Sequence, residues 1–299
     1  MKTALVTGAA GAIGRHVVRT LTARGWRVMG IGHGALPEDV ALAGWAGGEI
    51  DASNLDSLGA RPDAVVHLAG GSAVGRSLLA PDEDFQRTVA TTARLLDWLR
   101  VRAPEAALVL ASSAAVYGDV RQIPITEAMP CHPVSPYGRH KMMMENAAGE
   151  SGLRCVSLRL FSVYGPGLRK QLVWELCNRL ANGARELRLG GTGVETRDWL
   201  HINDAAAMLA DAIPAAIAGG VVLNGCTGAG ISVAETARAI MRGFDVKAEL
   251  HFSGETRKGD PVHLVGDPAK AINSGLKTLV SAADGLETTA AVMRQELRV

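Results

Sequence analysis

The sequence lacks several features that would indicate other classes of protein. Its four cysteines, Cys131, Cys155, Cys177 and Cys226, lie far apart and form no CxxC pair. This spacing argues against a zinc site or a disulfide framework and is typical of a reducing cytosol. No Cys/His cluster has ligand spacing, so we expect no metal site. No apolar stretch approaches the length of a membrane span, and we expect a cytoplasmic protein without a membrane partner.

The sequence also lacks an excess of charge of either sign. Its formal net charge is +1 over 299 residues, of which 20% are charged. Nucleic acid or an anionic membrane surface would call for a basic face, so we expect neither as a partner. The N-terminal apolar run is too short for the hydrophobic region of a signal peptide and breaks into glycines. With 47% hydrophobic residues, the chain can build a large core.

Short β-branched segments alternate with longer helical patterns in the first half of the chain. The expected strands are Thr3–Thr7, Arg27–Ile31, Ala64–Leu68, Ala107–Ala111 and Cys155–Arg159, and the expected helices are Ala12–Ala23, Asp82–Arg100 and one that begins at Ser135 and Pro136. This alternation is typical of βαβ units. It predicts an α/β fold of the Rossmann type, a doubly wound parallel sheet with helices on both faces.

The regular alternation fades after about residue 165. Here we expect helices at Gln171–Ala181, Ile202–Ile213 and Val233–Arg242, with short strands at Leu187–Leu189 and Val221–Leu223. No internal repeat or linker separates two independent units. We therefore expect a main domain over 1–165 and a smaller mixed α/β lobe over 166–299. The two are interleaved, and some later segments return to the main domain.

Three glycines follow the first expected strand and lead into a helix, in the order Gly8-Ala9-Ala10-Gly11-Ala12-Ile13-Gly14. Glycines permit a tight turn and a close backbone approach, and a helix N-terminus offers free N–H groups to a phosphate. At this place in the chain, the GxxGxxG spacing predicts a dinucleotide-binding turn. We expect its cofactor contacts at Gly8, Ala10, Gly11, Ala12, Ile13 and Gly14.

No acidic residue follows the second expected strand, where the sequence reads Gly30-Ile31-Gly32-His33-Gly34. A carboxylate at that point would bind the ribose 2′-OH of NAD and repel the 2′-phosphate of NADP. The absence of this carboxylate removes a reason to exclude NADP, so NADP stays open beside NAD, which we expect as the cofactor. His33 is a candidate cofactor contact, and it is equally well explained as a solvated loop residue.

Tyr137 and Lys141 form a YxxxK pair, and positions i and i+4 share one face of a helix. A free phenol has a pKa of about 10 and is a poor base at neutral pH. A neighbouring ammonium group stabilises the phenolate and lowers that pKa. Upstream, Ser112 and Ser113 end a buried strand, at the sheet edge where ligands bind in open parallel sheets. Tyr137, Lys141 and one of these two serines are therefore a candidate catalytic set.

Seven segments, in order, resemble the extended short-chain dehydrogenase/reductase family, in particular its UDP-glucose 4-epimerase branch. They are TGAAGAIG at 7–14, VVHLAGGSAVGRS at 65–77, SSAAVYGD at 112–119, SPYGRHK at 135–141, RLFSVYGPG at 159–167, RDWLHINDAA at 197–206 and RKGDPVHLVGDPAKA at 257–271. The resemblance covers almost the whole chain. It implies a dinucleotide-binding domain over 1–165, a sugar-nucleotide-binding lobe mainly over 166–299, and a homodimer.

Carried over residue by residue, the resemblance makes Tyr137 the general acid/base, Lys141 the residue that lowers its pKa and binds the nicotinamide ribose, and Ser113 the ligand of the reacting hydroxyl. It adds cofactor contacts at Asp51, Ala52, Leu68, Ala69 and Gly70. It implies substrate contacts at Ser113, Ser162, Gln171, Leu172, Leu187, Leu189, Arg197 and Arg257. The two arginines suit a diphosphate, because guanidinium stays charged and binds phosphate in a bidentate way.

The sequence departs from the epimerase pattern at several positions. Ser162 and Thr88 stand where epimerases usually carry asparagines, and Ser72 stands where they carry a cofactor-binding lysine. Ala114 and Ala115 replace the Asp-Glu pair of the 4,6-dehydratases, which argues against water elimination. We expect His140 to face solvent or the sheet rather than the substrate, and His201 to be structural.

The leading hypothesis is an NAD(P)-dependent 4-epimerase of a UDP-hexose that acts by transient oxidation at C4. The first alternative is an NADPH-dependent reductase of a nucleotide-4-keto-6-deoxy sugar, which would use the same Ser113, Tyr137 and Lys141. The absence of an acid after the second strand favours the reductase, whereas the SSAAVYGD and RDWLHINDAA segments favour the epimerase. A non-catalytic dinucleotide sensor is disfavoured because all three residues are present. The nucleotide and the sugar stay open.

Overall fold

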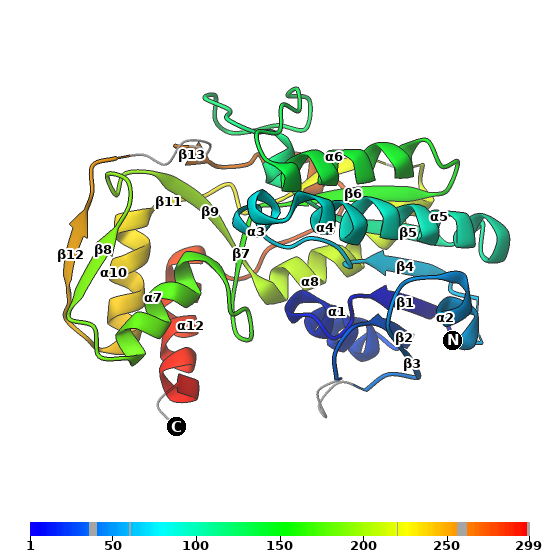
Figure 1. Ribbon diagram of the computed structural model, residues 1–299, viewed down its shortest axis with the longest axis horizontal. Coiled ribbons are helices and arrows are strands. Elements are labelled where there is room, and N and C mark those ends of the chain that lie inside the picture. The colour runs from blue at the N-terminus through cyan, green and yellow to red at the C-terminus, as the bar shows by residue number, and fades with distance from the viewer. Residues whose placement is uncertain (36–40, 60, 220, 256–261, 298–299) are drawn as a thin grey trace.

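The computed structural model describes residues 1–35, 41–59, 61–219, 221–255 and 262–297 (Figure 1). Its main element is a seven-stranded sheet in the order β10-β6-β5-β4-β1-β2-β3, in which every neighbouring pair is parallel. The strands are β1 (Thr3–Thr7), β2 (Arg27–Gly32), β3 (Gly44–Gly47), β4 (Ala64–His67), β5 (Ala107–Ser113), β6 (Cys155–Leu160) and β10 (Val222–Gly225). The strand order reverses between β1 and β4, which is where open α/β sheets bind ligands.

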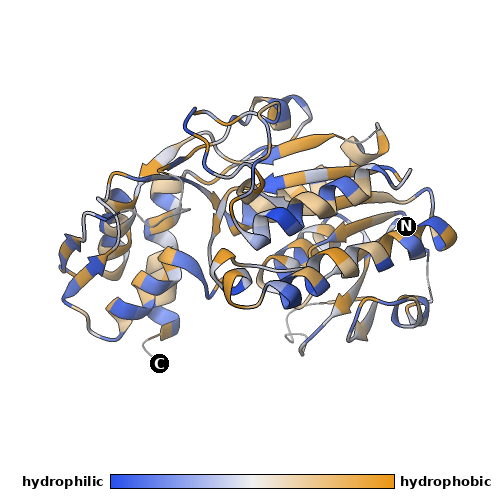
Figure 2. Cartoon of the chain, turned by 45° about the horizontal axis from the view of Figure 1, so that its top comes forward, coloured by the Kyte–Doolittle hydropathy of each residue, from blue (hydrophilic) through white to orange (hydrophobic). Residues whose placement is uncertain are grey.

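Helices cover both faces of this sheet, which confirms the predicted doubly wound fold. One face carries α1 (Ala12–Ala23), α8 (Ile202–Asp211) and α9 (Ile213–Ile217), and the other carries α2 (Ala52–Ser57), α5 (Thr91–Arg102) and α6 (Pro136–Gly149). Side chains alternate along β1: Val6 packs toward α1 and Leu5 toward α5. Figure 2 shows the apolar strands enclosed by helices whose outer surfaces are hydrophilic. Strands buried on both faces explain the continuous apolar runs in the sequence.

The helix expected over Asp82–Arg100 is present but irregular. It consists of α4 (Pro81–Phe85), a π-helical turn η1 (Gln86–Ala90) and α5, which ends at Arg102. The Gln86 carbonyl oxygen accepts from the backbone N–H of Thr91, five residues later, as in a π-helix, and also from the Thr91 hydroxyl at 3.0 Å. A short helix, α3 (Val74–Leu79), precedes this element and was not predicted.

The smaller lobe is built from β7 (Ser162–Tyr164), β8 (Glu186–Leu189), β9 (Thr196–His201), β11 (Gly230–Ser232), β12 (Glu249–Phe252), β13 (His263–Leu264), α7 (Gln171–Ala181), α10 (Val233–Phe244) and α12 (Ala282–Leu297). Helix α11 (Ala269–Asn273) instead packs against β10 and the core of the main sheet. Helices α7, α10 and α12 pack around their own apolar core. Helix α10 begins with a capping box in which Ser232 and Glu235 bond to each other's backbone N–H groups. Within the described residues, none of the helices combines the length and apolar composition needed to cross a membrane.

Candidate active site

A cleft of about 1330 Å³ opens at the carboxyl edge of the seven-stranded sheet, between the sheet and the smaller lobe. The turn after β1, the ends of β4 and β5 and the start of α6 form one wall, which we call the sheet wall. The residues that follow β6, together with α7, β8 and β9, form the other, which we call the lobe wall. The site residues predicted from the sequence are distributed between these two walls.

The glycine turn has the geometry that its spacing predicted. Gly8 has a φ of +67°, and a Cβ at Gly14 would lie 2.2 Å from the Gly8 carbonyl oxygen, so neither position accepts a larger residue. Helix α1 begins at Gly11 without a side-chain cap, and Gly8, Gly11, Ala12, Ile13 and Gly14 line the cleft. Ala10 does not line it. The uncapped N–H groups of the helix are suited to a pyrophosphate.

An acidic group lies beside His33, although none follows β2 in the sequence. Glu49 comes two residues after β3, and β3 pairs with β2 so that Gly47 lies opposite Gly32. The Glu49 carboxylate is 3.3 Å from His33 Nε2, and both residues line the cleft. Asp51 instead caps α2 by accepting from the Asn54 N–H at 2.8 Å, and neither Asp51 nor Ala52 lines the cleft.

The segment after β4 is held by one buried hydroxyl. Thr7 Oγ1 accepts from the N–H groups of Leu68 and Ala69 at 3.1 and 3.2 Å and bonds to His67 Nδ1 at 2.8 Å. Burial lowers the pKa of His67 to about 3, so this ring is neutral and serves as a support. Leu68, Ala69 and Gly70, which the resemblance predicts as cofactor contacts, line the cleft.

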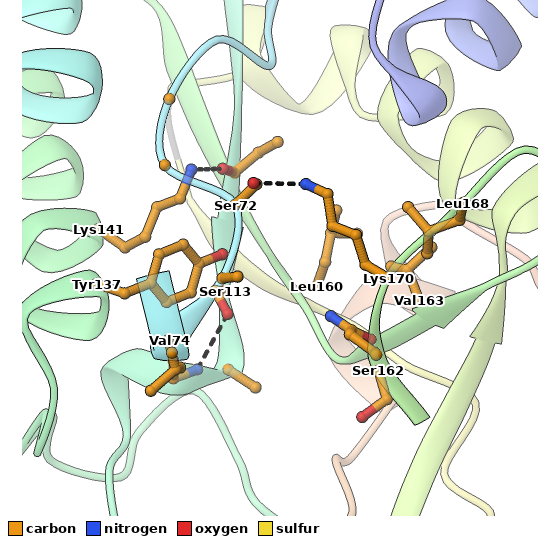
Figure 3. Close-up of a pocket in the computed structure, with 18 of the residues that line it drawn as sticks. Ser72, Val74, Ser113, Tyr137, Lys141, Leu160, Ser162, Val163, Leu168 and Lys170 are labelled. Carbon is orange, nitrogen blue, oxygen red and sulfur yellow. Dashed lines mark hydrogen bonds between the residues drawn. The ribbon is translucent and has the colours of Figure 1, made fainter. Parts of the chain in front are cut away.

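Helix α6 carries Tyr137 and Lys141 into the cleft from one face. Ser135 caps the helix by accepting from the Gly138 N–H at 3.1 Å, and Pro136 occupies the first turn. Lys141 Nζ donates to the carbonyl oxygen of Ala111 at 2.9 Å and lies 5.9 Å from the centre of the Tyr137 ring. Figure 3 shows both side chains next to Ser113, the last residue of β5.

Burial dominates the electrostatics of this group. It raises the pKa of Tyr137 despite an opposing hydrogen bond with Ser113, and the Asp84 charge raises it further. Burial lowers the pKa of Lys141 to about 8, against the attraction of Asp84 and Glu145. The direction for Tyr137 differs from the sequence prediction of a phenol pKa lowered by Lys141, because desolvation of the phenolate is the larger effect in the structure without ligands.

The prediction for His140 was wrong, since its ring faces neither solvent nor the sheet. His140 Nδ1 lies 2.6 Å from Asp84 Oδ2 on α4, and both side chains are buried, with exposed fractions of 12% and 6%. The edge of the Phe85 ring contacts the same imidazole. A Cβ on Gly71 would overlap the Asp84 carboxylate, so the chain beside the cleft lies directly on this pair.

A second buried ion pair lies behind α6. Glu145 accepts from Arg159 Nη2 at 2.7 Å and from the Ser112 hydroxyl, and the Arg159 guanidinium lies over the Tyr117 ring, 4.7 Å from its centre. The hydroxyl of Ser112 is therefore engaged away from the cleft. Its neighbour Ser113, the residue predicted from the resemblance, forms a hydrogen bond with Tyr137.

The lobe wall receives most of the predicted substrate contacts: Ser162, Gln171, Leu172, Leu189 and Arg197 line the cleft. Leu187 does not, because it is fully buried in the core of the smaller lobe. Arg257 lies outside the described residues. Arg197 Nη1 donates to its own neighbour, the Thr196 carbonyl oxygen, at 2.9 Å. His201 caps α8 and contacts the Tyr164 ring, as expected of a structural residue.

The sequence reasoning missed two residues of the site, Lys170, which lines the cleft, and Asp84, which is buried beside it. Lys170 Nζ donates to Ser72 Oγ at 2.5 Å and so joins the lobe wall to the sheet wall (Figure 3). Asp84 was read only as part of a helix, yet its charge acts on both Tyr137 and Lys141. Neither residue belongs to a short motif, because the partners of each are more than fifty positions away in the chain. No local pattern could have found them.

Fold and cleft define a nucleotide-binding enzyme with a Rossmann-type sheet, and comparison with known proteins identifies the family. The sequence profile of the NAD dependent epimerase/dehydratase family matches residues 4–224. The chain therefore belongs to the NAD dependent epimerase/dehydratase family, and it is an enzyme.

Individual relatives agree with this assignment. The chain is 32% identical to a UDP-glucose 4-epimerase of Azospirillum brasilense, over 87% of this chain and 82% of the relative. Its structure is similar to that of MoeE5 in complex with UDP-glucuronic acid and NAD, with a TM-score of 0.89, 29% identity, and 98% and 99% of the two chains covered. A UDP-glucose 4-epimerase of Thermotoga maritima, solved with UDP-glucose, gives a TM-score of 0.88 at 27% identity, with 99% of each chain covered.

Proposed function

We propose that this enzyme is an NAD-dependent 4-epimerase of a UDP-hexose. The observation that carries the proposal is the convergence of Ser113, Tyr137 and Lys141 on the sheet wall, directly beside the glycine turn. A phenol, a hydroxyl and an ammonium group at one point of a cleft are suited to remove and return the proton of a sugar alcohol. A relative named UDP-glucose 4-epimerase, 32% identical to this chain, supports the same reaction.

The residues of the chain handle the proton and hold the sugar. Tyr137 takes the proton of the C4 hydroxyl as a phenolate and gives it back as a phenol, and Ser113 orients that hydroxyl by hydrogen bonding. Lys141, fixed by its bond to the Ala111 carbonyl oxygen, stabilises the phenolate with its positive charge. Bound NAD supplies the hydride acceptor and the hydride donor at C4. Because the sugar returns to its original oxidation state, no cofactor is consumed.

The residues present fit NAD. The glycine turn leaves no room for a Cβ at Gly14, and the uncapped start of α1 faces the cleft, which suits a pyrophosphate. Glu49, beside His33, places a carboxylate at the end of the cleft where the sheet order predicts the adenosine ribose. Such a carboxylate accepts a hydrogen bond from a 2′-OH and repels a 2′-phosphate. This favours NAD over NADP and weakens the reductase alternative.

The cleft also suits a second ligand that is held from the lobe wall. Its volume of about 1330 Å³ exceeds the roughly 300–1,000 Å³ of a pocket for one small molecule. Arg197 brings a permanent charge to the lobe wall, which suits the diphosphate of a sugar nucleotide. On the sheet wall, Ala114 and Ala115 line the cleft and supply no carboxylate, so elimination of water from the sugar has no acid/base pair there.

The first test is to purify the protein without added cofactor and to look for bound nicotinamide by absorbance and fluorescence. The protein is then incubated with NAD and with UDP-glucose or UDP-N-acetylglucosamine, and the sugars are identified by chromatography. The expected result is conversion to the 4-epimer with no net change in NADH absorbance. Steady consumption of NADPH with a 4-keto-6-deoxy sugar nucleotide, and no epimer from either UDP-sugar, would replace the epimerase with the reductase.

A further inference from the structure

Figure 3 shows the side chain of Lys170 reaching from the lobe wall to Ser72 on the sheet wall. It immediately precedes α7, and its Nζ donates to Ser72 Oγ at 2.5 Å across a sequence separation of 98 residues. Ser72 directly follows Gly70 and Gly71, and Gly70 lies against the Nζ of Lys141, so the contact crosses the cleft close to Lys141. Lys170 is therefore placed where a ligand lying along the cleft must pass.

Among the residues that the structure describes, no carboxylate lies within ion-pair distance of Lys170, and its hydrogen-bond partner is the neutral hydroxyl of Ser72. Partial burial lowers the pKa of Lys170, and the positive charge of the nearby Arg76 guanidinium lowers it further. Arg76 itself is paired with Glu83 at 3.1 Å, so that carboxylate is already engaged. A cation held in such surroundings gains most from an anion brought by a ligand.

The backbone next to Lys170 adds to this arrangement. Gln171 has a φ of +63°, a left-handed conformation that costs energy in a residue other than glycine. Helix α7 begins there without a side-chain cap, and Gln171 and Leu172 line the cleft. The strained turn therefore brings a lysine and the positive end of an eleven-residue helix to the same part of the lobe wall.

We propose that Lys170 is a diphosphate-binding residue of the cleft, which exchanges the hydroxyl of Ser72 for a phosphate oxygen when a ligand binds. The inference rests on the proposed function only for the class of ligand, a nucleoside diphosphate group. That group can come from the sugar nucleotide or from the dinucleotide cofactor. In either case, Lys170 also ties the smaller lobe to the loop after β4 through the ligand.

The test measures binding without turnover, by titration calorimetry with UDP and, separately, with NAD. The variants are Lys170→Met, which keeps the length of the side chain, Lys170→Arg, which keeps the charge, and Lys277→Met, which removes an exposed lysine that does not line the cleft. We expect Lys170→Met to weaken one of the two ligands at least tenfold, since a hydrogen bond to a charged group is lost. Lys170→Arg should restore most of the affinity, and Lys277→Met should bind as the unchanged protein does.

The pattern of losses identifies the source of the diphosphate. A loss confined to UDP assigns Lys170 to the sugar nucleotide, and a loss confined to NAD assigns it to the cofactor. The ligand that still binds normally demonstrates in the same experiment that the variant is folded. Unchanged affinity for both ligands would overturn the proposal, and so would an equal loss in Ser72→Ala, because that variant removes the bridge and keeps the cation. None of these outcomes depends on which sugar reaction the enzyme catalyses.

Discussion

The two walls of the cleft are built in different ways. On the sheet wall, Tyr137 and Lys141 stand on a capped helix, and Lys141 is 4% exposed and bonded to a strand carbonyl. On the lobe wall, Lys170, Arg188 and Arg197 are long cations, and Arg188 keeps 77% of its side chain exposed. Proton transfer requires groups fixed to within a fraction of an ångström, whereas holding a diphosphate tolerates side chains that adjust. Substitutions should therefore affect turnover on one wall and affinity on the other.

The largest expected effect tests this division on the sheet wall. Tyr137→Phe removes only the hydroxyl that would carry the proton, and we expect turnover to fall about 10³-fold. The dissociation constant of UDP, measured by calorimetry, should change less than threefold, because the ring still fills its place. A large loss of UDP affinity would mean that Tyr137 holds the ligand, and the two walls would then not differ as described.

Lys141 provides a second test, of stability. The pKa of Lys141 is about 8 in the folded state and 10.5 in the unfolded state. Below pH 8 the ammonium group is charged in both states, so its burial lowers the free energy of unfolding by the full amount. This loss of stability disappears as the pH rises towards 10.5, because the amine is then neutral in the folded state. Lys141→Met should therefore raise the free energy of unfolding in urea at pH 7 by up to about 3 kcal/mol, and by little at pH 10.5. The same variant should be nearly inactive.

The control for Lys141 is Lys277→Met, an exposed position at which we expect a change below about 0.5 kcal/mol at either pH. A Lys141→Met protein that is less stable than the unchanged one at pH 7 would contradict the assignment of a costly buried cation. The ammonium group of Lys141 would then stabilise the folded state instead of lowering its stability.

On the lobe wall, Arg197→Met should act on affinity. If Arg197 holds the diphosphate as proposed, its loss should weaken binding of UDP about tenfold or more, with kcat at saturating substrate within threefold of the original value. Arg242→Met is the matched control, because Arg242 forms a surface pair with Glu287 on α10 and α12, away from the cleft. A fall in kcat without a change in affinity would place Arg197 with the sheet wall.

The smallest effect concerns the carboxylate behind the sheet wall. Asp84 raises the pKa of both Tyr137 and Lys141, while it is itself bonded to His140, and Glu145 also acts on Lys141. Asp84→Asn should therefore shift both limbs of the pH–rate profile to lower pH, by less than about one unit. Glu83→Gln, on the exposed side of the same helix and paired with Arg76, should leave the profile in place. A shift to higher pH would contradict the sign of the Asp84 effect.

The sequence could predict one wall far better than the other. The GxxGxxG turn and the YxxxK pair are local, because strand-to-helix turns and helical faces are set by residues a few positions apart. The lobe wall is assembled from separate segments, and Lys170 meets Ser72 only in the folded chain. Leu187 illustrates the same limit: Leu187 and Leu189 lie on the same face of β8, yet Leu189, at the end of the strand, lines the cleft, whereas Leu187 is buried in the core of the smaller lobe.

The elements that were missed have related causes. Strand β3 reads Gly-Trp-Ala-Gly, a composition poor in β-branched residues, and it forms only because β2 offers it an edge. The carboxylate of Glu49 becomes adjacent to His33 through that pairing, so the sequence alone left the cofactor open. The His140 prediction was wrong because its partner, Asp84, lies on another helix, and no local pattern in the sequence indicates that pairing.

The π-helical turn over Gln86–Ala90 has a consequence for how this enzyme can vary. The wide turn holds one residue more than a regular helix would, and each residue of a helix turns the chain by about 100°. Thr88 Oγ1, in the middle of that turn, accepts from the Gly71 N–H at 2.8 Å, while Asp84, before it, meets His140. Deleting a single residue here would rotate one of these two contacts away from the other. In related sequences, substitutions on the outer face of this helix should therefore be tolerated, whereas an insertion or deletion of one residue should not.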